Sequence, residues 1–142
     1  MNKNYQTVLK DAGIRPSIQR IAIYSYLCEH HTHPDVEEIF AELSPLYPTL
    51  SKTTIYNTLQ LFTENHLIQA IKIDNDKIRY DAEMSDHLHF KCDKCGNIFD
   101  IYEGSNITAL FKECEKQLPE GFVMRRIETD IWGTCPACNK KQ

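Results

Sequence analysis

Two cysteine pairs constrain this chain more than any other feature of its sequence. Cys92 with Cys95 and Cys135 with Cys138 form two C-x-x-C turns, and 39 residues (96–134) lie between them. One such turn presents two thiolates to an ion, and two turns complete the tetrahedral four-sulfur coordination of structural zinc. We therefore expect a structural zinc site that joins the beginning of a small domain to its end.

Disulfides and a redox-active pair are the alternatives for these cysteines. The N-terminal residues contain no apolar segment typical of a secretory signal, and no apolar run approaches the roughly 18–20 residues of a membrane helix. We therefore expect a cytoplasmic protein without a membrane segment, where reducing conditions disfavour disulfides. Duplication of a redox pair has no evident purpose. Cys28 and Cys114 fall on apolar helical stripes and are expected to be ordinary buried side chains.

The first half of the chain has the periodicity of helices. The whole chain has 142 residues, of which 42% are hydrophobic and 25% charged, so it is a globular protein of one or two domains rather than a disordered one. Apolar residues at helical spacing predict four helices within residues 1–67. Ser17 and Ser51 are suitable N-caps for the second and fourth helices, and the third begins after Pro34. Asn65 suits a left-handed helix end.

After these helices the period changes to that of strands. Apolar residues alternate with polar ones over 71–73 and 78–81, and the turn-forming residues 74–77 separate the two runs. This pattern predicts a β-hairpin. Helices followed by a hairpin are the outline of a winged helix-turn-helix, with Ser51–Glu64 as the recognition helix and the hairpin as the wing.

The second half of the chain predicts a small α/β unit. Short strands are expected at 88–91 and 97–101 around the first cysteine turn, a helix over 107–118, and a further strand over 123–132. The fold class is therefore α+β. We expect an N-terminal winged-helix domain over residues 1–82, a hinge over 83–87 and the zinc-containing domain over 88–142.

A second metal site is indicated by histidines and carboxylates. His87 and His89 alternate along a strand, so both imidazoles point to one side, and neighbouring imidazoles are common metal ligands. Asp81 ends the wing and Asp100 ends a strand. His33 joins this set if its segment folds back. Mixed nitrogen and oxygen ligands suit iron, manganese or zinc without selecting among them. Ordinary surface positions are the alternative for each residue.

Together these segments resemble the ferric uptake regulator family. The resemblance covers nearly the whole chain, and the order and spacing of its elements are specific. Its elements are Ser51-Lys52-Thr53-Thr54-Ile55-Tyr56-Asn57-Thr58-Leu59, Arg79-Tyr80-Asp81, Ser85-Asp86-His87-Leu88-His89-Phe90-Lys91-Cys92-Asp93-Lys94-Cys95-Gly96, and Trp132-Gly133-Thr134-Cys135 with Cys138.

The resemblance implies a homodimeric, metal-dependent repressor that binds a palindromic operator in double-stranded DNA, with residues 88–142 as the dimerisation domain. Iron-sensing members usually carry Glu at the positions of Asp81 and Asp100, whereas the peroxide-sensing branch carries Asp at both. By resemblance, the regulatory metal is ferrous iron or manganese, with zinc as a third candidate, and peroxide oxidises His33 or His87. The ligand set that the resemblance implies is His33, Asp81, His87, His89 and Asp100.

The charge of the chain argues weakly against a nucleic-acid partner. The net charge is −4, and residues 1–82 carry eight basic and ten acidic side chains. The distribution of charge matters more than its sum, because phosphate contacts are local. The candidate DNA contacts are Arg15, Arg20, Lys52, Thr53, Tyr56 and Asn57.

Three other functions compete with a peroxide-sensing repressor. One is a regulator of the same family that senses iron or zinc availability. Another is a non-haem iron enzyme using His87, His89 and one aspartate, although the chain has little room for a substrate pocket. The last is a purely structural zinc-binding interaction module, which would show no metal-dependent DNA affinity.

Overall fold

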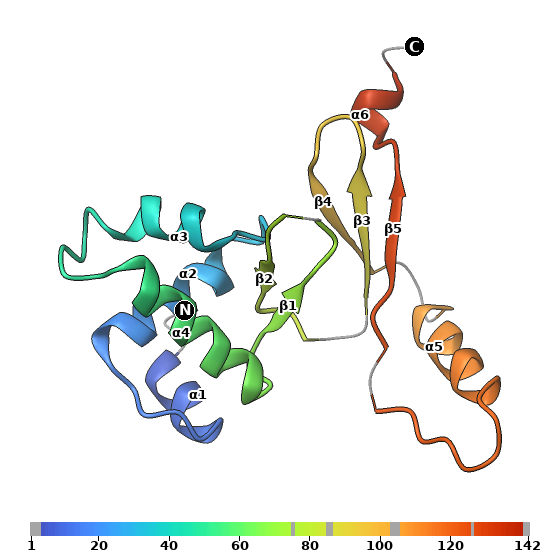
Figure 1. Ribbon diagram of the computed structural model, residues 1–142, viewed down its shortest axis with the longest axis horizontal. Helices are drawn as coiled ribbons and strands as arrows, with labels where there is room; N and C mark the ends of the chain where they lie inside the picture. The colour runs from blue at the N-terminus through green and yellow to red at the C-terminus, as the bar shows by residue number, and fades with distance from the viewer. Residues whose placement is uncertain (1–3, 75, 85–86, 103–105, 126, 141–142) are drawn as a thin grey trace. The chain divides into compact units, whose positions relative to one another are not determined.

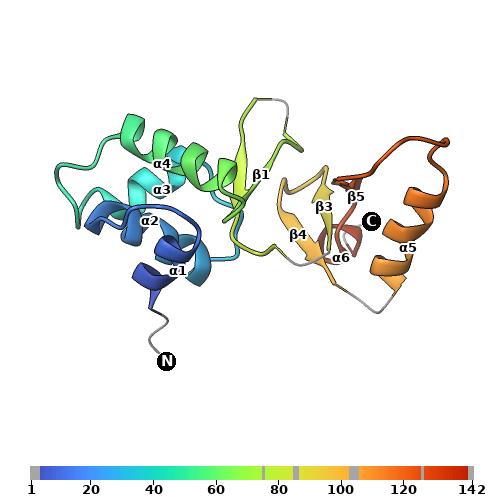
Figure 2. The same ribbon diagram turned by 90° about the horizontal axis from the view of Figure 1, so that it is seen from below.

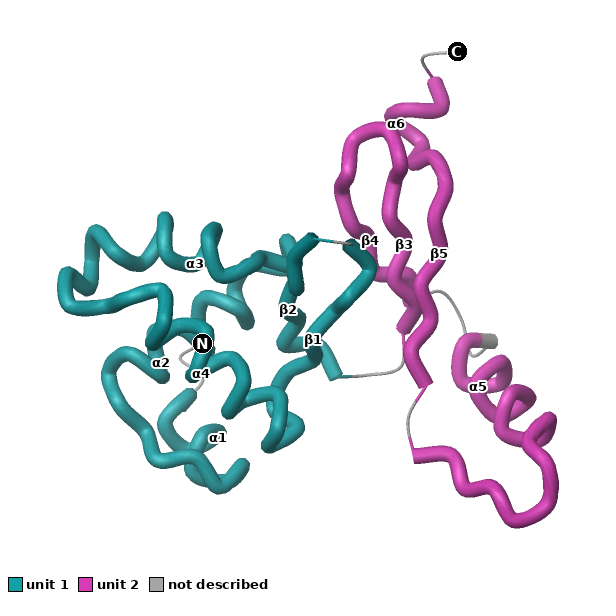
Figure 3. Tube along the Cα trace, in the orientation of Figure 1, with its two compact units in different colours: residues 1–84 teal, residues 85–142 magenta. Residues whose placement is uncertain are grey.

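The computed structural model describes residues 4–74, 76–84, 87–102, 106–125 and 127–140. The chain forms two compact units, residues 1–84 and residues 85–142 (Figure 3). Residues 85 and 86 of the expected hinge lie outside the described residues. Among the described residues, no helix has the length and apolar character needed to cross a membrane.

Unit 1 consists of four helices and one hairpin. Figures 1 and 2 both show the helices of this unit gathered on one side of the hairpin. Its elements are α1 (Tyr5–Asp11), α2 (Ile18–Glu29), α3 (Val36–Leu43), α4 (Lys52–Glu64), β1 (Gln69–Ile71) and β2 (Arg79–Asp81). This is the predicted order of four helices and a hairpin.

Side-chain caps fix where the helices of unit 1 begin. The hydroxyl oxygens of Ser17 and Ser51 accept hydrogen bonds from the backbone N–H groups three residues on, at 3.1 Å each, as predicted. The prediction for Asn65 is wrong, because its φ is −93° and the left-handed residue is His66, with φ of 58°. The Asn65 amide instead donates to the Leu61 carbonyl at 2.8 Å and closes the last turn of α4.

The helices of unit 1 enclose its hydrophobic core. The apolar stripe of α4, Ile55, Leu59 and Phe62, is fully buried. The hairpin is antiparallel, with Ala70 opposite Tyr80, and β1 lies two residues earlier than the predicted strand. The burial of the apolar stripe leaves the opposite face of α4 exposed. The fully or almost fully buried aliphatic residues that α1, α2 and α3 contribute are Leu9, Ile23, Leu27 and Ile39.

Unit 2 is built on a three-stranded sheet of order β4-β3-β5, in which β3 pairs antiparallel with β4 and parallel with β5. The predicted strand over 123–132 is mostly wrong. Residue 126 of that range lies outside the described residues; in the described part, pairing with β3 is confined to 130–133, and Val123 is 76% exposed. The elements of this unit are β3 (Leu88–Cys92), β4 (Ile98–Ile101), α5 (Asn106–Lys116), β5 (Asp130–Gly133) and α6 (Pro136–Asn139).

Candidate metal centres and nucleic-acid interface

The four predicted cysteines lie together in unit 2. Their sulfur atoms are all within 4.8 Å of one another, and Cys95 Sγ is 3.8 Å from Cys135 Sγ. A tetrahedral ion with Zn–S bonds of about 2.3 Å places its sulfur ligands about 3.8 Å apart. The cluster therefore has the dimensions of a closed four-sulfur site.

The sheet explains why the two cysteine turns meet across 39 intervening residues. Because β3 and β5 are parallel neighbours, both turns follow the carboxyl ends of adjacent strands, and Cys92 pairs with Gly133. Parallel strands require a crossover connection, which here contains β4 and α5. Figure 1 shows α6, which carries Cys138, beside the turn between β3 and β4.

Backbone donors prepare one of these sulfurs for a metal. The Cys135 N–H donates to Cys92 Sγ at 3.3 Å. Together with the backbone N–H groups of Cys95 and Lys94, it lowers the pKa of the Cys92 thiol to about 6, because these donors stabilise the thiolate. Cys138 behaves oppositely: its hydrogen bond with Cys135, together with burial, raises its pKa to about 12. The Cys92 thiol is therefore more easily ionised than the Cys138 thiol.

Unit 1 holds two of the predicted regulatory ligands. His33 lies between α2 and α3, and Asp81 ends β2. His33 Nε2 is 3.5 Å from Asp81 Oδ2, and both side chains are 2% exposed. An imidazole nitrogen and a carboxylate oxygen are thereby aimed at one buried point, as the ligand hypothesis requires.

Unit 2 holds the other three predicted regulatory ligands. His87 and His89 have their Nε2 atoms 3.0 Å apart, and Asp100 Oδ1 lies 3.3 Å from the first and 3.5 Å from the second. Both histidines are buried. Ligand atoms about 2.0–2.2 Å from one ion are typically about 3.0–3.5 Å apart, so these three groups fit a shared metal.

Two further residues contact this group and were not predicted. Asp130 on β5 lies 3.8 Å from His89 Nδ1, and Tyr102 donates to Asp100 Oδ2 at 3.1 Å while its ring stacks on His87. Burial raises the pKa of Asp130, against the opposing effect of His89. The sequence contains no local signal for Asp130, because its approach depends on a strand pairing across 41 positions.

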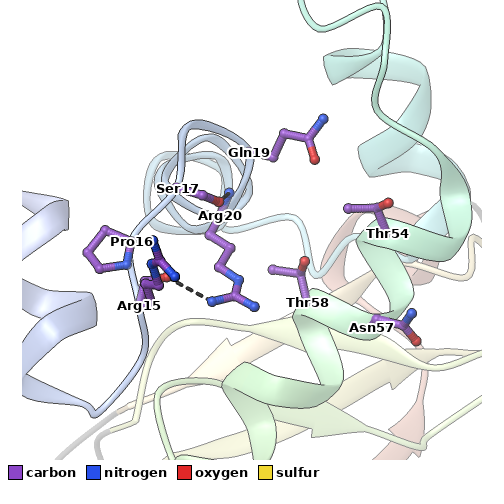
Figure 4. A pocket seen from close by; sticks show the side chains of 8 residues that line it. All are labelled: Arg15, Pro16, Ser17, Gln19, Arg20, Thr54, Asn57 and Thr58. Carbon is purple, nitrogen blue, oxygen red and sulfur yellow. Dashed lines mark hydrogen bonds between the residues drawn. The ribbon is translucent and has the colours of Figure 1, made fainter.

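Three predicted DNA contacts line a cavity of about 550 Å³ in unit 1, namely Arg15, Arg20 and Asn57. The Arg20 guanidinium donates to the Arg15 carbonyl at 2.8 Å. Figure 4 shows Arg20 extending from the start of α2 toward the α4 residues Thr58 and Asn57. The cavity is therefore basic, lies at a helix N-terminus and carries amide and hydroxyl groups, which suits a phosphate. Thr54, Thr58 and Gln19 also line it and were not predicted.

The other three predicted contacts, Lys52, Thr53 and Tyr56, are exposed on α4 and do not line this cavity. Tyr56 is 49% exposed. The Lys52 ammonium is 2.7 Å from Glu37 on α3 and lies over the Phe40 ring. Lys52 consequently already neutralises an acidic neighbour, which reduces the charge it offers to another partner.

Helices with a hairpin wing in one unit, and a four-cysteine cluster with buried imidazoles in the other, define a metal-responsive DNA-binding regulator. The model of the ferric uptake regulator family matches residues 11–127. The chain belongs to this family, whose members are transcriptional regulators that bind DNA as dimers.

Individual relatives agree with this assignment. The chain is 33% identical over 133 residues to the peroxide-responsive repressor PerR of Staphylococcus aureus, covering 94% of this chain and 88% of that protein. A PerR structure from Streptococcus pyogenes is 30% identical, with a TM-score of 0.52, and the match covers 96% of this chain and 94% of that one. The manganese-containing regulator of Pseudomonas aeruginosa is 18% identical, with a TM-score of 0.78 over 94% and 99% of the two chains, and supports the fold.

Proposed function

We propose that this protein is a metal-dependent, peroxide-responsive repressor. The observation that carries the proposal is the pairing of imidazole with aspartate in both units, at His33–Asp81 and His89–Asp100. Aspartate at both carboxylate positions, and similarity to peroxide-responsive repressors at about one third identity, support this branch of the family.

The four-cysteine cluster is assigned a structural zinc ion. Cys92, Cys95, Cys135 and Cys138 would hold it, and four thiolates leave no coordination position open for chemistry. The ion would tie α6 to the turn between β3 and β4. Since structural zinc supplies folding free energy directly, the site would maintain the fold of unit 2 and its capacity to dimerise.

The regulatory ion is assigned ligands from both units. His33 and Asp81 provide two, and His87, His89 and Asp100 provide three. Neither group completes the coordination of ferrous iron or manganese alone, so one shared ion would favour the arrangement of the units in which all five groups reach it. Metal binding and DNA binding are then coupled if that same arrangement binds the operator.

Bound ferrous iron would supply the one-electron reduction of hydrogen peroxide. The ligand imidazoles of His33 and His87 would be the first groups exposed to the resulting oxidant. In the net reaction, an imidazole C–H would take one oxygen atom from peroxide, the second oxygen would leave as water, and the electron given by iron would return to the iron as the imidazole is oxidised. An oxidised imidazole is a poorer ligand, so the shared site would weaken and the operator would be released.

The DNA partner is assigned to the basic cavity and the exposed face of α4. Arg15 and Arg20 would contact phosphate near the start of α2, while Tyr56 and Asn57 on the recognition helix would reach bases or sugars. A dimer would apply this surface twice, which suits a palindromic operator with half-sites related by two-fold symmetry.

Anaerobic DNA binding tests this function. Zinc-retaining protein would be loaded with Fe²⁺ or with Mn²⁺, and its affinity for operator DNA would be measured before and after a low dose of peroxide. We expect both metals to promote binding and peroxide to release only the iron-loaded protein. If peroxide releases neither form, a sensor of iron or zinc availability explains the chain better. If neither metal promotes binding, the regulatory proposal fails.

A further inference from the structure

The backbone of His33 adopts an unusual conformation. Its φ is 55°, and His66 is the only other non-glycine residue with positive φ in the described part of the chain. A residue with a Cβ atom is disfavoured in this left-handed region and remains there only when its surroundings hold it. The groups that contact the His33 segment therefore decide where its imidazole lies.

Arg79 is the side chain that holds this segment. Its Nη1 donates to the His33 carbonyl at 3.3 Å, and its Nε donates to Asp74 Oδ2 at 2.6 Å. The Arg79 and Asp74 side chains are only 13% and 3% exposed. The next backbone N–H, from Tyr80, donates to the Pro34 carbonyl at 3.0 Å. Two neighbouring residues of β2 thus bond consecutive carbonyls of the His33 segment, and Asp74 in the loop before β2 fixes the Arg79 side chain.

Strand geometry places the Arg79 hydrogen bond beside the His33–Asp81 ligand pair. Residues 79 and 81 of β2 point to one face, because side chains alternate along a strand, while Tyr80 is buried in the core. Asp81 contacts the His33 imidazole and Arg79 contacts the His33 carbonyl. One short strand therefore supplies a carboxylate ligand and the group that orients its partner imidazole.

We infer that Arg79, fixed by Asp74, is a positioning residue for the regulatory metal, and that it acts by holding His33 in its left-handed conformation. The inference rests on the proposed function, in which His33 and Asp81 are ligands. Arg79 itself does not touch the ion. The planar guanidinium makes two bonds in fixed directions, which a lysine ammonium cannot reproduce from the same position.

A Mn²⁺ titration of the full-length, zinc-retaining protein tests this role, with the signal of free Mn²⁺ in electron paramagnetic resonance as the readout. Four variants are compared with the unmodified chain: Arg79→Gln, Arg79→Lys, His33→Ala and the double variant Arg79→Gln/His33→Ala. Lys72→Ala is the matched control, because it removes an exposed positive charge just after β1. Circular dichroism confirms that each variant is folded.

We expect Arg79→Gln to weaken Mn²⁺ binding by roughly tenfold or more, the usual effect of losing a group that orients a ligand. Arg79→Lys keeps the positive charge beside Asp74, so its Mn²⁺ affinity should lie between those of Arg79→Gln and the unmodified chain. Arg79→Gln should cause no further loss when His33 is already Ala, and Lys72→Ala should bind Mn²⁺ normally.

Two results would overturn the inference alone. The first is normal Mn²⁺ affinity in both Arg79→Gln and Arg79→Lys. The second is that Arg79→Gln lowers Mn²⁺ affinity equally in the unmodified chain and in the His33→Ala chain. The second result would show that Arg79 acts on the fold in general. Normal affinity in His33→Ala would instead remove His33 from the site, overturning the ligand assignment and the inference together. The two failures are therefore distinguishable.

Discussion

His89 on β3 is paired directly across the sheet with Asp100 on β4, and its Nε2 atom lies 3.5 Å from the Asp100 carboxylate. On the other side, the same histidine is in register with Asp130 on β5. The central strand thus places one imidazole between two carboxylates, one facing Nε2 and the other facing Nδ1. This arrangement is typical of a metal ligand with an orienting carboxylate behind it.

We expect Asp130→Asn to weaken binding of the regulatory metal by roughly 10- to 100-fold, because the neutral amide orients His89 less strongly. The measurement is a Mn²⁺ titration of zinc-retaining protein. Glu120→Gln, a like change at an exposed position, is the control. Equal Mn²⁺ affinity in both variants would show that Asp130 does not support His89.

Replacing Cys92 with Ser should release zinc and unfold unit 2, because Cys92 is fully buried and its sulfur lies within the cluster. Zinc content and molecular mass in solution provide the measurements. Cys114→Ser makes the same chemical change outside the cluster and should retain both zinc and the dimer. A zinc-free Cys92→Ser protein that remains a folded dimer would refute the structural-zinc assignment.

The zinc affinity of this cluster should fall as pH decreases, most steeply below about pH 6. The Cys92 pKa is lowered to about 6 by backbone donors, so this thiol is charged above that pH and binds a competing proton below it. Zinc transfer to a chromophoric chelator, followed from pH 8 to pH 5, measures the effect. If the fall of zinc affinity with pH does not steepen below about pH 6, the donors assigned to Cys92 are contradicted.

Removing the Arg20 guanidinium should weaken DNA binding for all sequences alike. If Arg20 contacts phosphate, Arg20→Ala should reduce the slope of log affinity against log salt by about one per subunit. Operator binding at several salt concentrations supplies the slope. Arg125→Ala removes an exposed arginine of unit 2 and is the control for net charge. Identical slopes for the two variants would exclude Arg20 from the interface.

Local sequence signals predicted much of unit 1. The caps at Ser17 and Ser51 and the apolar stripe of α4 are properties of neighbouring residues, and all are confirmed. The left-handed residue after α4 was predicted one position too early, because Asn65 bonds back to Leu61 and His66 adopts that conformation instead.

Contacts distant in sequence could not be predicted in the same way. The start of β5, where Asp130 faces His89, depends on a parallel pairing that no local pattern specifies. The hydrogen bond from Arg79 to the His33 carbonyl joins residues 46 positions apart and depends on backbone geometry at both ends. The sequence could therefore identify candidate ligands, whereas the residues that orient them required the structure.

In the proposed mechanism, peroxide acts on ligand histidines of an iron-loaded site. The most direct measurement is peptide mass spectrometry after a low dose of peroxide, made on iron-loaded and manganese-loaded protein alongside operator binding. We expect one added oxygen on a peptide containing His33 or His87 in the iron-loaded protein only, with loss of operator binding in step. The claim would be contradicted if operator release followed oxidation of Cys92, Cys95, Cys135 or Cys138 and loss of zinc, with both histidines intact.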